Sequence, residues 1–302
     1  MDFITGENDK DRRLDRILRK AMPEHSLALI HRLLRQGKVL VNGKPAKAQD
    51  RIGVTVKISI PSLNDTLNPS IKVLTHTQNT PISLDIIWED RGLIAVNKPA
   101  GIAVHGQNSL DTCVQSFLAG KTTPSLSFKP GPLHRLDKPS SGIIIFSVNI
   151  EGARLFTSLI KEKKVQKIYL AIVMGTIKNE EIWQDILIRD KEKKKTYVEN
   201  QSHQGKTAIT KVTPLAAKNN FSLIQAEIIT GRTHQIRAQA SFHGYPLLGD
   251  VKYGGQKAKT GEQKVDLFLH ALKLEFLEYS IEAPLPIVFK QRVKELFGII
   301  MT

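Results

Sequence analysis

The stretch GPLHRLDKPSSGIIIF, residues 131–146, places one carboxylate, Asp137, in a short polar segment directly before an apolar run. Pro139 disfavours a helical conformation for Lys138, the residue before it, so the segment is predicted to be a loop. Gly142 allows an unusual backbone angle where the chain enters IIIFSV, which has the pattern of a buried strand. A carboxylate at the mouth of such a strand and next to a cation is either part of a structural ion pair or a chemical reagent.

The composition indicates a folded protein with an anionic partner. The 302 residues suffice for one large and one small domain, and 41% hydrophobic residues support a core. Lysine and arginine number 44 against 29 acidic residues, a formal net charge of +15. An excess of this size usually indicates a polyanion, most often nucleic acid, but a basic soluble protein without one has the same composition.

Several classes of protein are disfavoured by what the sequence lacks. Cys113 is the only cysteine, so neither an intrachain disulfide nor a thiolate metal cluster is expected. The start of the chain has no apolar core of a signal peptide, and no run of about 18 apolar residues occurs. We therefore expect a cytoplasmic protein without a membrane partner.

The N-terminal segment predicts a compact unit of two helices and a few strands. Apolar residues recur at helical spacing in DRRLDRILRKA and again after Ser26, a plausible N-cap, up to Gly37. Asn42-Gly43 then gives a strong signal for a two-residue hairpin. The predicted module covers residues 12–60.

The charge of this module is strongly one-sided. Exposed helix faces often carry such cations without any ligand. However, RRLDRILRKAMPEHSLALIHRLLRQGKVLVNGKPA resembles the RNA-binding module first described in ribosomal protein S-four, in which two helices and the following loop contact RNA phosphates. The resemblance implies RNA binding, and the cations we expect to take part are Arg12, Arg13, Arg16, Arg32, Arg35, Lys38 and Lys44.

Beyond the module, residues 61–81 are polar, rich in turn formers and predicted to be a linker. Strands and helices then mix through residues 82–302, which we expect to form the second domain. AGKTT and QGKTA imitate a phosphate loop, but neither has the required glycine five residues earlier. The histidines show no metal-ligand spacing. We expect no metal and no cofactor.

Polar residues stand inside apolar surroundings in four segments of this domain. They are VNKPAGIAVHG, HRLDKPSSG, QKIYLAIVMG and TGRTHQIRAQASFHGYPLLGDVKYG. We expect the last to begin a helix at Thr230, which places Thr233 and Arg237 on one helix face. Taken singly, Asp137 is explained as a loop cap, Tyr169 as a core aromatic and Arg237 as a surface cation.

Together and in this order, the four segments resemble the RluA family of pseudouridine synthases. HRLDKPSSG matches the family's His-Arg-Leu-Asp signature, which contains the essential Asp. KIYLAIV matches the segment that carries the active-site Tyr. TGRTHQIR matches the segment whose last Arg pairs with the essential Asp. The resemblance implies that Asp137, Tyr169 and Arg237 are catalytic. It also implies an α+β fold with a mixed, mainly antiparallel central sheet and flanking helices.

The implied reaction moves uracil from a nitrogen link to a carbon link on ribose, so it needs a carboxylate beside the sugar. Asp137 either attacks the anomeric carbon or removes a sugar proton, and the sequence does not decide between these. Arg237 is expected to favour its ionised form, and Tyr169 to pack on the uracil and relay its proton. The nucleotide must be flipped out, and Arg135 either fills the vacated stack or contacts a phosphate. His134 and Arg232 are further expected RNA contacts.

The sequence thus predicts a monomeric RNA pseudouridine synthase for large-subunit ribosomal RNA, because the added module tends to accompany synthases of this class in the family. A synthase acting on tRNA is one alternative. A non-catalytic RNA-binding factor of ribosome assembly is the other. The sequence does not determine the modified uridine and carries no direct signal of the oligomeric state, for which a monomer is the expectation.

Overall fold

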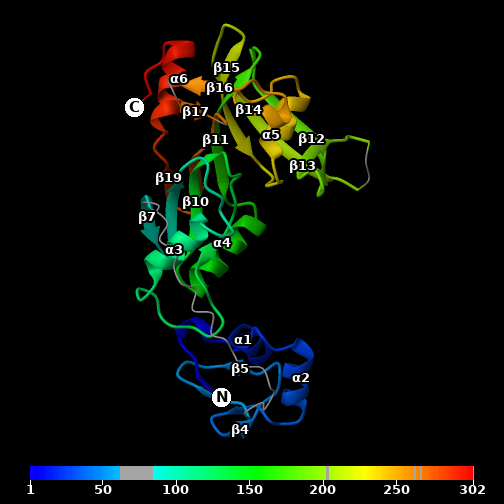
Figure 1. The fold of residues 1–302 in the computed structure, drawn as a ribbon, viewed down its shortest axis with the longest axis vertical. Helices are drawn as coiled ribbons and strands as arrows, with labels where there is room; N and C mark the ends of the chain where they lie inside the picture. The colour runs from blue at the N-terminus through cyan, green and yellow to red at the C-terminus, as the bar shows by residue number, and fades with distance from the viewer. Residues whose placement is uncertain (62–83, 202–203, 261–262, 266, 302) are drawn as a thin grey trace.

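In the computed structural model, the chain forms a small N-terminal module and a larger body, which follow one another along the long axis (Figure 1). Apart from residue 61, the predicted linker lies outside the described residues. The structure describes residues 1–61, 84–201, 204–260, 263–265 and 267–301.

Two short helices form the core of the module, as the spacing of their apolar residues predicts. They are α1 (Leu14–Ala21) and α2 (Leu27–Arg35). Ser26 caps α2, because its side chain accepts a hydrogen bond from the Leu29 amide at 3.2 Å. The buried faces of both helices pack with Ile58 and other strand residues in one apolar cluster.

Short strands complete the module. Asn42 and Gly43 have φ values of 47° and 80°, the left-handed conformations that the predicted two-residue hairpin requires. Within residues 1–61, the strands form a four-stranded sheet in the order β1-β6-β3-β4 and a β2-β5 ribbon, so β1 adds residues ahead of the predicted start at residue 12. The strands are β1 (Asp2–Ile4), β2 (Arg12–Arg13), β3 (Leu40–Val41), β4 (Lys44–Pro45), β5 (Arg51–Ile52) and β6 (Lys57–Ser59).

A large sheet organises the body. In the part of the chain that the structure describes it has 11 strands, in the order β13-β12-β14-β15-β11-β18-β10-β8-β7, with β19 beside β18 and β9 beside β10. The β10–β18 pair is parallel and the others are antiparallel, which confirms the expected sheet. The strands are β7 (Ile86–Asp90), β8 (Leu93–Lys98), β9 (Gly131–Pro132), β10 (Ser141–Ser147), β11 (Gln166–Met174), β12 (Glu181–Asp190), β13 (Lys195–Val198), β14 (Lys206–Lys218), β15 (Phe221–Ile228), β18 (Leu269–Phe276) and β19 (Tyr279–Glu282).

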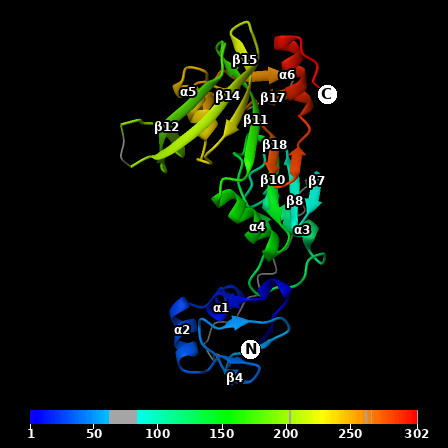
Figure 2. The same ribbon diagram turned by 180° about the vertical axis from the view of Figure 1, so that it is seen from behind.

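Helices flank this sheet. Helices α3 and α4 lie beside the end that contains β7 to β10, whereas α5 lies against β12 and β13 (Figures 1 and 2). The mixed α+β class predicted from the sequence is therefore confirmed. The remaining elements are η1 (Glu7–Asp9), α3 (Leu110–Leu118), α4 (Ile150–Lys161), α5 (Gln235–Phe242), η2 (Val251–Tyr253), β16 (Ala258–Thr260), β17 (Gln263–Val265) and α6 (Ile287–Phe297).

Helix α5 begins later than the sequence predicts. It starts at Gln235, after an N-cap at His234 that has a left-handed backbone with φ of 54°. The Gln235 side chain instead closes the preceding loop, accepting a hydrogen bond from the Thr230 hydroxyl at 2.8 Å. Thr233 therefore lies outside the helix, and the expectation that it shares a helix face with Arg237 is wrong.

The register of the central strands brings distant segments together. Ala271 of β18 is the partner of both Gly142 in β10 and Tyr169 in β11. Gly142 has φ of 107°, and a Cβ atom there would lie 2.2 Å from the Ala271 carbonyl oxygen, so the position requires glycine. The close approach of β10 and β18 places the loop of Asp137 beside Tyr169.

Candidate active site

Asp137 lies in the loop between β9 and β10, as the sequence predicts. The Ser140 amide donates to the Asp137 carbonyl at 3.1 Å, which closes a tight turn around Pro139. The Asp137 side chain is 14% exposed, so its carboxylate is largely withdrawn from water but remains open to a ligand. The loop thus presents one accessible carboxylate at the centre of the sheet.

Arg237 joins Asp137 to a second carboxylate. Its Nη1 donates to Asp137 Oδ2 at 3.0 Å, while its Nε and Nη2 donate to the two Asp250 oxygens at 2.7 and 2.8 Å. Burial would lower the pKa of Arg237, but the hydrogen bonds and charges of both carboxylates raise it instead. Arg237 is therefore a permanent cation of fixed orientation.

Asp250 was not singled out by the sequence reasoning, although it lies in the quoted segment that ends in GYPLLGDVKYG. Its side chain is only 2% exposed. A buried carboxylate is retained where a partner satisfies it, and the bidentate pair with Arg237 meets this requirement. The signal in the sequence was an acidic residue inside an apolar turn, between Gly249 and Val251.

His234 is another neighbour of Asp137 that sequence reasoning missed. Its Nε2 lies 3.6 Å from Asp137 Oδ1, and its Nδ1 is 2.7 Å from the Tyr253 hydroxyl. Burial lowers the pKa of His234 to about 4, although the charge of Asp137 opposes this shift. The ring is therefore neutral at physiological pH. The sequence predicted a helix at this position, whereas His234 lies in a loop with a left-handed backbone, so its contact with Asp137 was not predicted.

Tyr169 lies on β11 and shares a sheet face with Ala171 and Val173, because alternate residues of a strand point to the same side. Only 7% of the residue is exposed. Burial and, to a smaller extent, the nearby charge of Asp137 raise the pKa of the Tyr169 phenol. The hydroxyl is therefore protonated across the physiological range.

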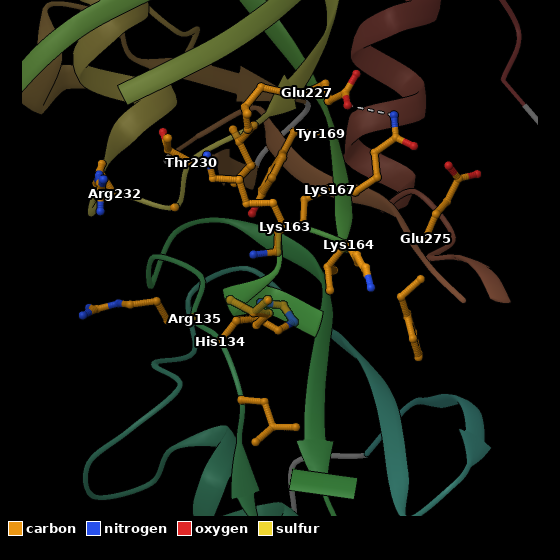
Figure 3. Close-up of a pocket in the computed structure, with 18 of the residues that line it drawn as sticks. His134, Arg135, Lys163, Lys164, Lys167, Tyr169, Glu227, Thr230, Arg232 and Glu275 are labelled. Carbon is orange, nitrogen blue, oxygen red and sulfur yellow. Dashed lines mark hydrogen bonds between the residues drawn. The ribbon is translucent and has the colours of Figure 1, made fainter. Parts of the chain in front are cut away.

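A cavity of about 670 Å³ opens beside Asp137 and Tyr169 (Figure 3). Its volume lies within the usual range for small-molecule sites. Lys163, Lys164 and Lys167 line it, and none of them was predicted. Burial lowers the pKa of Lys167, and none of the described acidic side chains forms an ion pair with it. This half-buried cation on the same face as Tyr169 suits an anionic ligand.

The three predicted RNA contacts of the body all line this cavity. Arg135 and Arg232 are exposed and lie on the same side of it (Figure 3). His134 instead accepts a hydrogen bond from the Ile145 amide at 3.0 Å through Nε2, and burial lowers its pKa to about 3. The structure therefore gives His134 a neutral ring that braces the loop against β10.

Lys98, in the quoted segment VNKPAGIAVHG, supports the loop from behind. Its fully buried ammonium donates to the carbonyl oxygens of Pro99 and Ile102 at 2.9 Å and of Lys138 at 3.2 Å. Burial lowers the pKa of Lys98 to about 8, while the charge of Asp137 acts in the opposite direction. The segment was noted in the sequence, but this contact was not predicted.

The predicted cations of the module differ in their surroundings. Arg12 is half-buried and donates to the Ser127 carbonyl of the body at 3.0 Å. Arg13 pairs with Asp15 at 2.7 Å. The others are exposed, which leaves them accessible to phosphates, and they are Arg16, Arg32, Arg35, Lys38 and Lys44.

The described ranges contain neither a membrane-spanning helix nor a cluster of metal-ligating side chains. No helix there is long and apolar enough to span a bilayer. No group of three or more histidine, cysteine, aspartate or glutamate side chains is arranged to hold a metal ion in the same residues.

The chain matches known protein families and relatives over most of its length. Residues 92–242 match the family described as RNA pseudouridylate synthase, and residues 12–58 match the S4 domain. The chain is 31% identical over 302 residues to an uncharacterized RNA pseudouridine synthase of Bacillus subtilis (strain 168), covering 95% of this chain and 94% of the relative. It is 33% identical over 307 residues to ribosomal large subunit pseudouridine synthase C of Rickettsia bellii (strain RML369-C), covering 96% and 99%.

A solved structure shares the fold. The human RNA pseudouridylate synthase domain containing 4 matches with a TM-score of 0.58 and 24% identity, over 70% of this chain and 92% of that chain.

Proposed function

The chain belongs to the RNA pseudouridylate synthase family and is an RNA pseudouridine synthase, and we propose that large-subunit ribosomal RNA is its substrate. The observation that carries the catalytic part of the proposal is the accessible Asp137 carboxylate, held 3.0 Å from Arg237 at the wall of a cavity of nucleotide size. Two findings support the ribosomal target: the S4 domain and the names of full-length relatives.

The reaction is an isomerisation, so substrate and product contain the same atoms. The bond from ribose C1′ to uracil N1 breaks, a bond from C1′ to C5 forms, C5 loses a proton and N1 gains one. Asp137 either attacks C1′ and is later released, or takes a sugar proton and returns it. Both routes need an ionised carboxylate.

Arg237 places a cation against the Asp137 carboxylate and fixes its geometry. Because two of its nitrogens are bound to Asp250, the third is aimed at Asp137 without freedom to turn. Asp250 therefore acts as a positioning residue for Arg237. An ionised Asp137 of fixed orientation needs no reorganisation when the sugar arrives.

Tyr169 is proposed to form the wall against which the uracil packs. A flat phenol ring next to Asp137 suits stacking on a base. Because burial raises its pKa, the phenol is a poor base at neutral pH, and proton relay by Tyr169 has to use the neutral hydroxyl. We therefore propose that Tyr169 takes part in proton transfer only by forming hydrogen bonds through its neutral hydroxyl.

A uridine in a helix cannot present its sugar to a carboxylate at the bottom of a cavity, so the nucleotide is proposed to flip out of the RNA. Arg135 and Arg232 at the cavity rim are placed to meet the RNA, where Arg135 either fills the vacated stack or contacts a phosphate. Lys163, Lys164 and Lys167 are proposed to neutralise phosphates beside the flipped nucleotide.

Mapping of pseudouridines in cells that lack the gene tests the target. We expect one or more sites in large-subunit ribosomal RNA to be lost and to return with the wild-type gene, but not with Asp137→Asn. The purified enzyme should modify the same sites in a transcript. Loss of pseudouridines confined to tRNA would identify a pseudouridine synthase that acts on tRNA. If no pseudouridine were lost but ribosome assembly were impaired, the non-catalytic alternative would be favoured.

A further inference from the structure

A buried polar joint connects the module to the body. The short helix η1, just before α1, meets the loop at residues 123–128 that follows α3 (Figure 2). Leu126 of this loop packs on the apolar core of the module. A Cβ atom at Gly6 would lie 2.1 Å from the Pro124 carbonyl oxygen, so only glycine permits this approach.

Asp9 is the centre of the joint. It is 0% exposed, and its Oδ1 accepts hydrogen bonds from the Ser125 hydroxyl at 2.7 Å and from both the amide and the hydroxyl of Ser127. Its Oδ2 accepts from the amides of Leu126 and Gly6, each at 3.0 Å. Burial would raise the pKa of Asp9, but these hydrogen bonds lower it. The carboxylate is thus held ionised inside the joint.

Neighbouring contacts extend the joint to both sides of Asp9. The Asn8 side chain accepts from the Ile150 amide at the start of α4 at 2.8 Å. Arg12 donates to the Ser127 carbonyl at 3.0 Å. Arg12 and Asp9 of the module therefore bind the same loop of the body, and both contact Ser127.

These contacts fix an orientation between two RNA-binding surfaces. Four of the five hydrogen bonds that Asp9 accepts come from one loop of the body, so the buried carboxylate accepts few other arrangements, because any shift leaves buried groups without partners. The exposed module cations are thereby held in one position relative to the cavity of Asp137. A ligand that touches both surfaces gains from this fixed spacing, whereas a ligand that touches only the cavity does not.

We propose that Asp9 is a positioning residue that locks the RNA-binding module to the catalytic body and so selects RNAs in which the uridine and the module's binding segment stand at a fixed spacing. The selection of RNA rests on the proposed ribosomal substrate. The locking of the module does not.

The first test needs no RNA. Full-length wild-type protein, Asp9→Asn and Asp11→Asn are compared by small-angle X-ray scattering. Asp9→Asn replaces one acceptor oxygen by an NH2 group that faces amide and hydroxyl donors, so we expect a larger radius of gyration. Asp11 is exposed, and among the residues that the structure describes its carboxylate forms an ion pair with Arg51 alone, so Asp11→Asn is the matched control and should scatter like wild type. Equal scattering of Asp9→Asn and wild type would overturn the locking role.

The second test compares two substrates. One is a large-subunit ribosomal RNA transcript, and the other is a short stem–loop that carries the same uridine. On the long RNA, Asp9→Asn should raise KM about tenfold or more with kcat nearly unchanged, and on the stem–loop both constants should match wild type. If scattering showed that the module of Asp9→Asn is released but KM on the long RNA were unchanged, the role of Asp9 in RNA selection would be overturned.

A variant on the opposite side of the joint protects the test against misfolding. Ser125→Ala/Ser127→Ala removes two hydroxyl donors from the body and leaves Asp9 in place. It should expand the protein and raise KM on the long RNA in the same direction as Asp9→Asn. A wild-type enzyme inactive on both RNAs would refute the ribosomal substrate, and scattering would then decide the locking role alone.

Discussion

The centre of the body and the surface of the N-terminal module use charge in opposite ways. Beside Asp137, opposite charges are paired at fixed positions: Arg237 is shared between Asp137 and Asp250, and 8% of its side chain is exposed. On the module, cations such as Arg35 and Lys44 are exposed. The function of the centre depends on the exact positions of its charged groups, whereas RNA binding by the module depends on the sum of its charges.

This difference determines how each region should respond to substitution. In the centre, removal of one group leaves another buried charge without a partner, so single changes should have large effects. On the module, water already solvates the exposed cations and neighbouring cations remain, so single changes of these cations should have small, graded effects.

Asp137→Asn should have the largest effect. The amide has nearly the same shape but cannot act as a nucleophile or a base, so we expect product formation to fall by on the order of a thousandfold or more. RNA affinity and the thermal unfolding midpoint should stay close to wild type. Single-turnover assays on a ribosomal RNA transcript measure this, and a variant that converts uridine at a near wild-type rate would show that the assignment of Asp137 is wrong.

Arg237→Met should reduce both stability and activity, because it leaves the buried Asp137 and Asp250 without their cation. We expect a loss of about 3–5 kcal/mol in the free energy of unfolding, measured by urea denaturation. Arg91→Met is the matched control, since the pair of Arg91 and Glu278 is exposed to water and should contribute little to the free energy of unfolding.

A double-mutant cycle tests the partner directly. Arg237→Met/Asp250→Asn should destabilise the protein less than the sum of its two single changes, because the second change removes the orphaned charge. Additive effects would mean that the bidentate pair does not contribute to folding.

The sequence predicted most of the local structure because the signals were local. The apolar spacing gave α1 and α2, Asn42-Gly43 gave its hairpin, and the run after Gly142 gave β10. The pairing of Asp137 with Arg237 was also expected, and it came from the family resemblance, since the two residues lie 100 positions apart.

What could not be predicted depends on contacts between distant segments or on unusual backbone. His234 was hidden because a side-chain hydrogen bond from Thr230 to Gln235 replaces the first helical turn. Asp250 stands in an apolar turn, but that pattern does not name its partner, which is found only when the fold places Arg237 against it. Asp9 likewise gains its partners only when a loop more than 110 residues away docks on it.

His134 offers a smaller test, through pH. Burial lowers its pKa to about 3, so between the ordinary histidine value of 6.5 and that pH the unfolded chain binds a proton that the folded chain excludes. Stability should therefore fall as pH decreases across this window, and this one histidine should contribute a slope of about 1.4 kcal/mol per pH unit.

His134→Gln keeps an acceptor for the Ile145 amide but does not titrate, so urea denaturation between pH 6 and 4 should show a shallower slope by about that amount. His105→Gln is the control, since His105 is exposed, with 61% of its side chain accessible. An unchanged slope for His134→Gln would mean that the ring is accessible to protons in the folded protein.

The smallest effect is expected on the module. Arg35→Gln removes one exposed cation without touching Asp9, whereas deletion of the whole module would also destroy the joint with the body. Each lost phosphate contact releases one fewer counterion, so the slope of log affinity against log salt should fall by about 0.7 to 0.9. The rate at saturating RNA should not change, because the transition-state contacts belong to the body.

Lys218→Gln, at an exposed end of β14, is the control. If Arg35→Gln and Lys218→Gln both gave the same slope as wild type on the ribosomal RNA transcript, Arg35 would not contact a phosphate and would belong to a solvated surface. The module and the centre of the body would then differ in how their charges are arranged, but a role of Arg35 in RNA binding would be refuted.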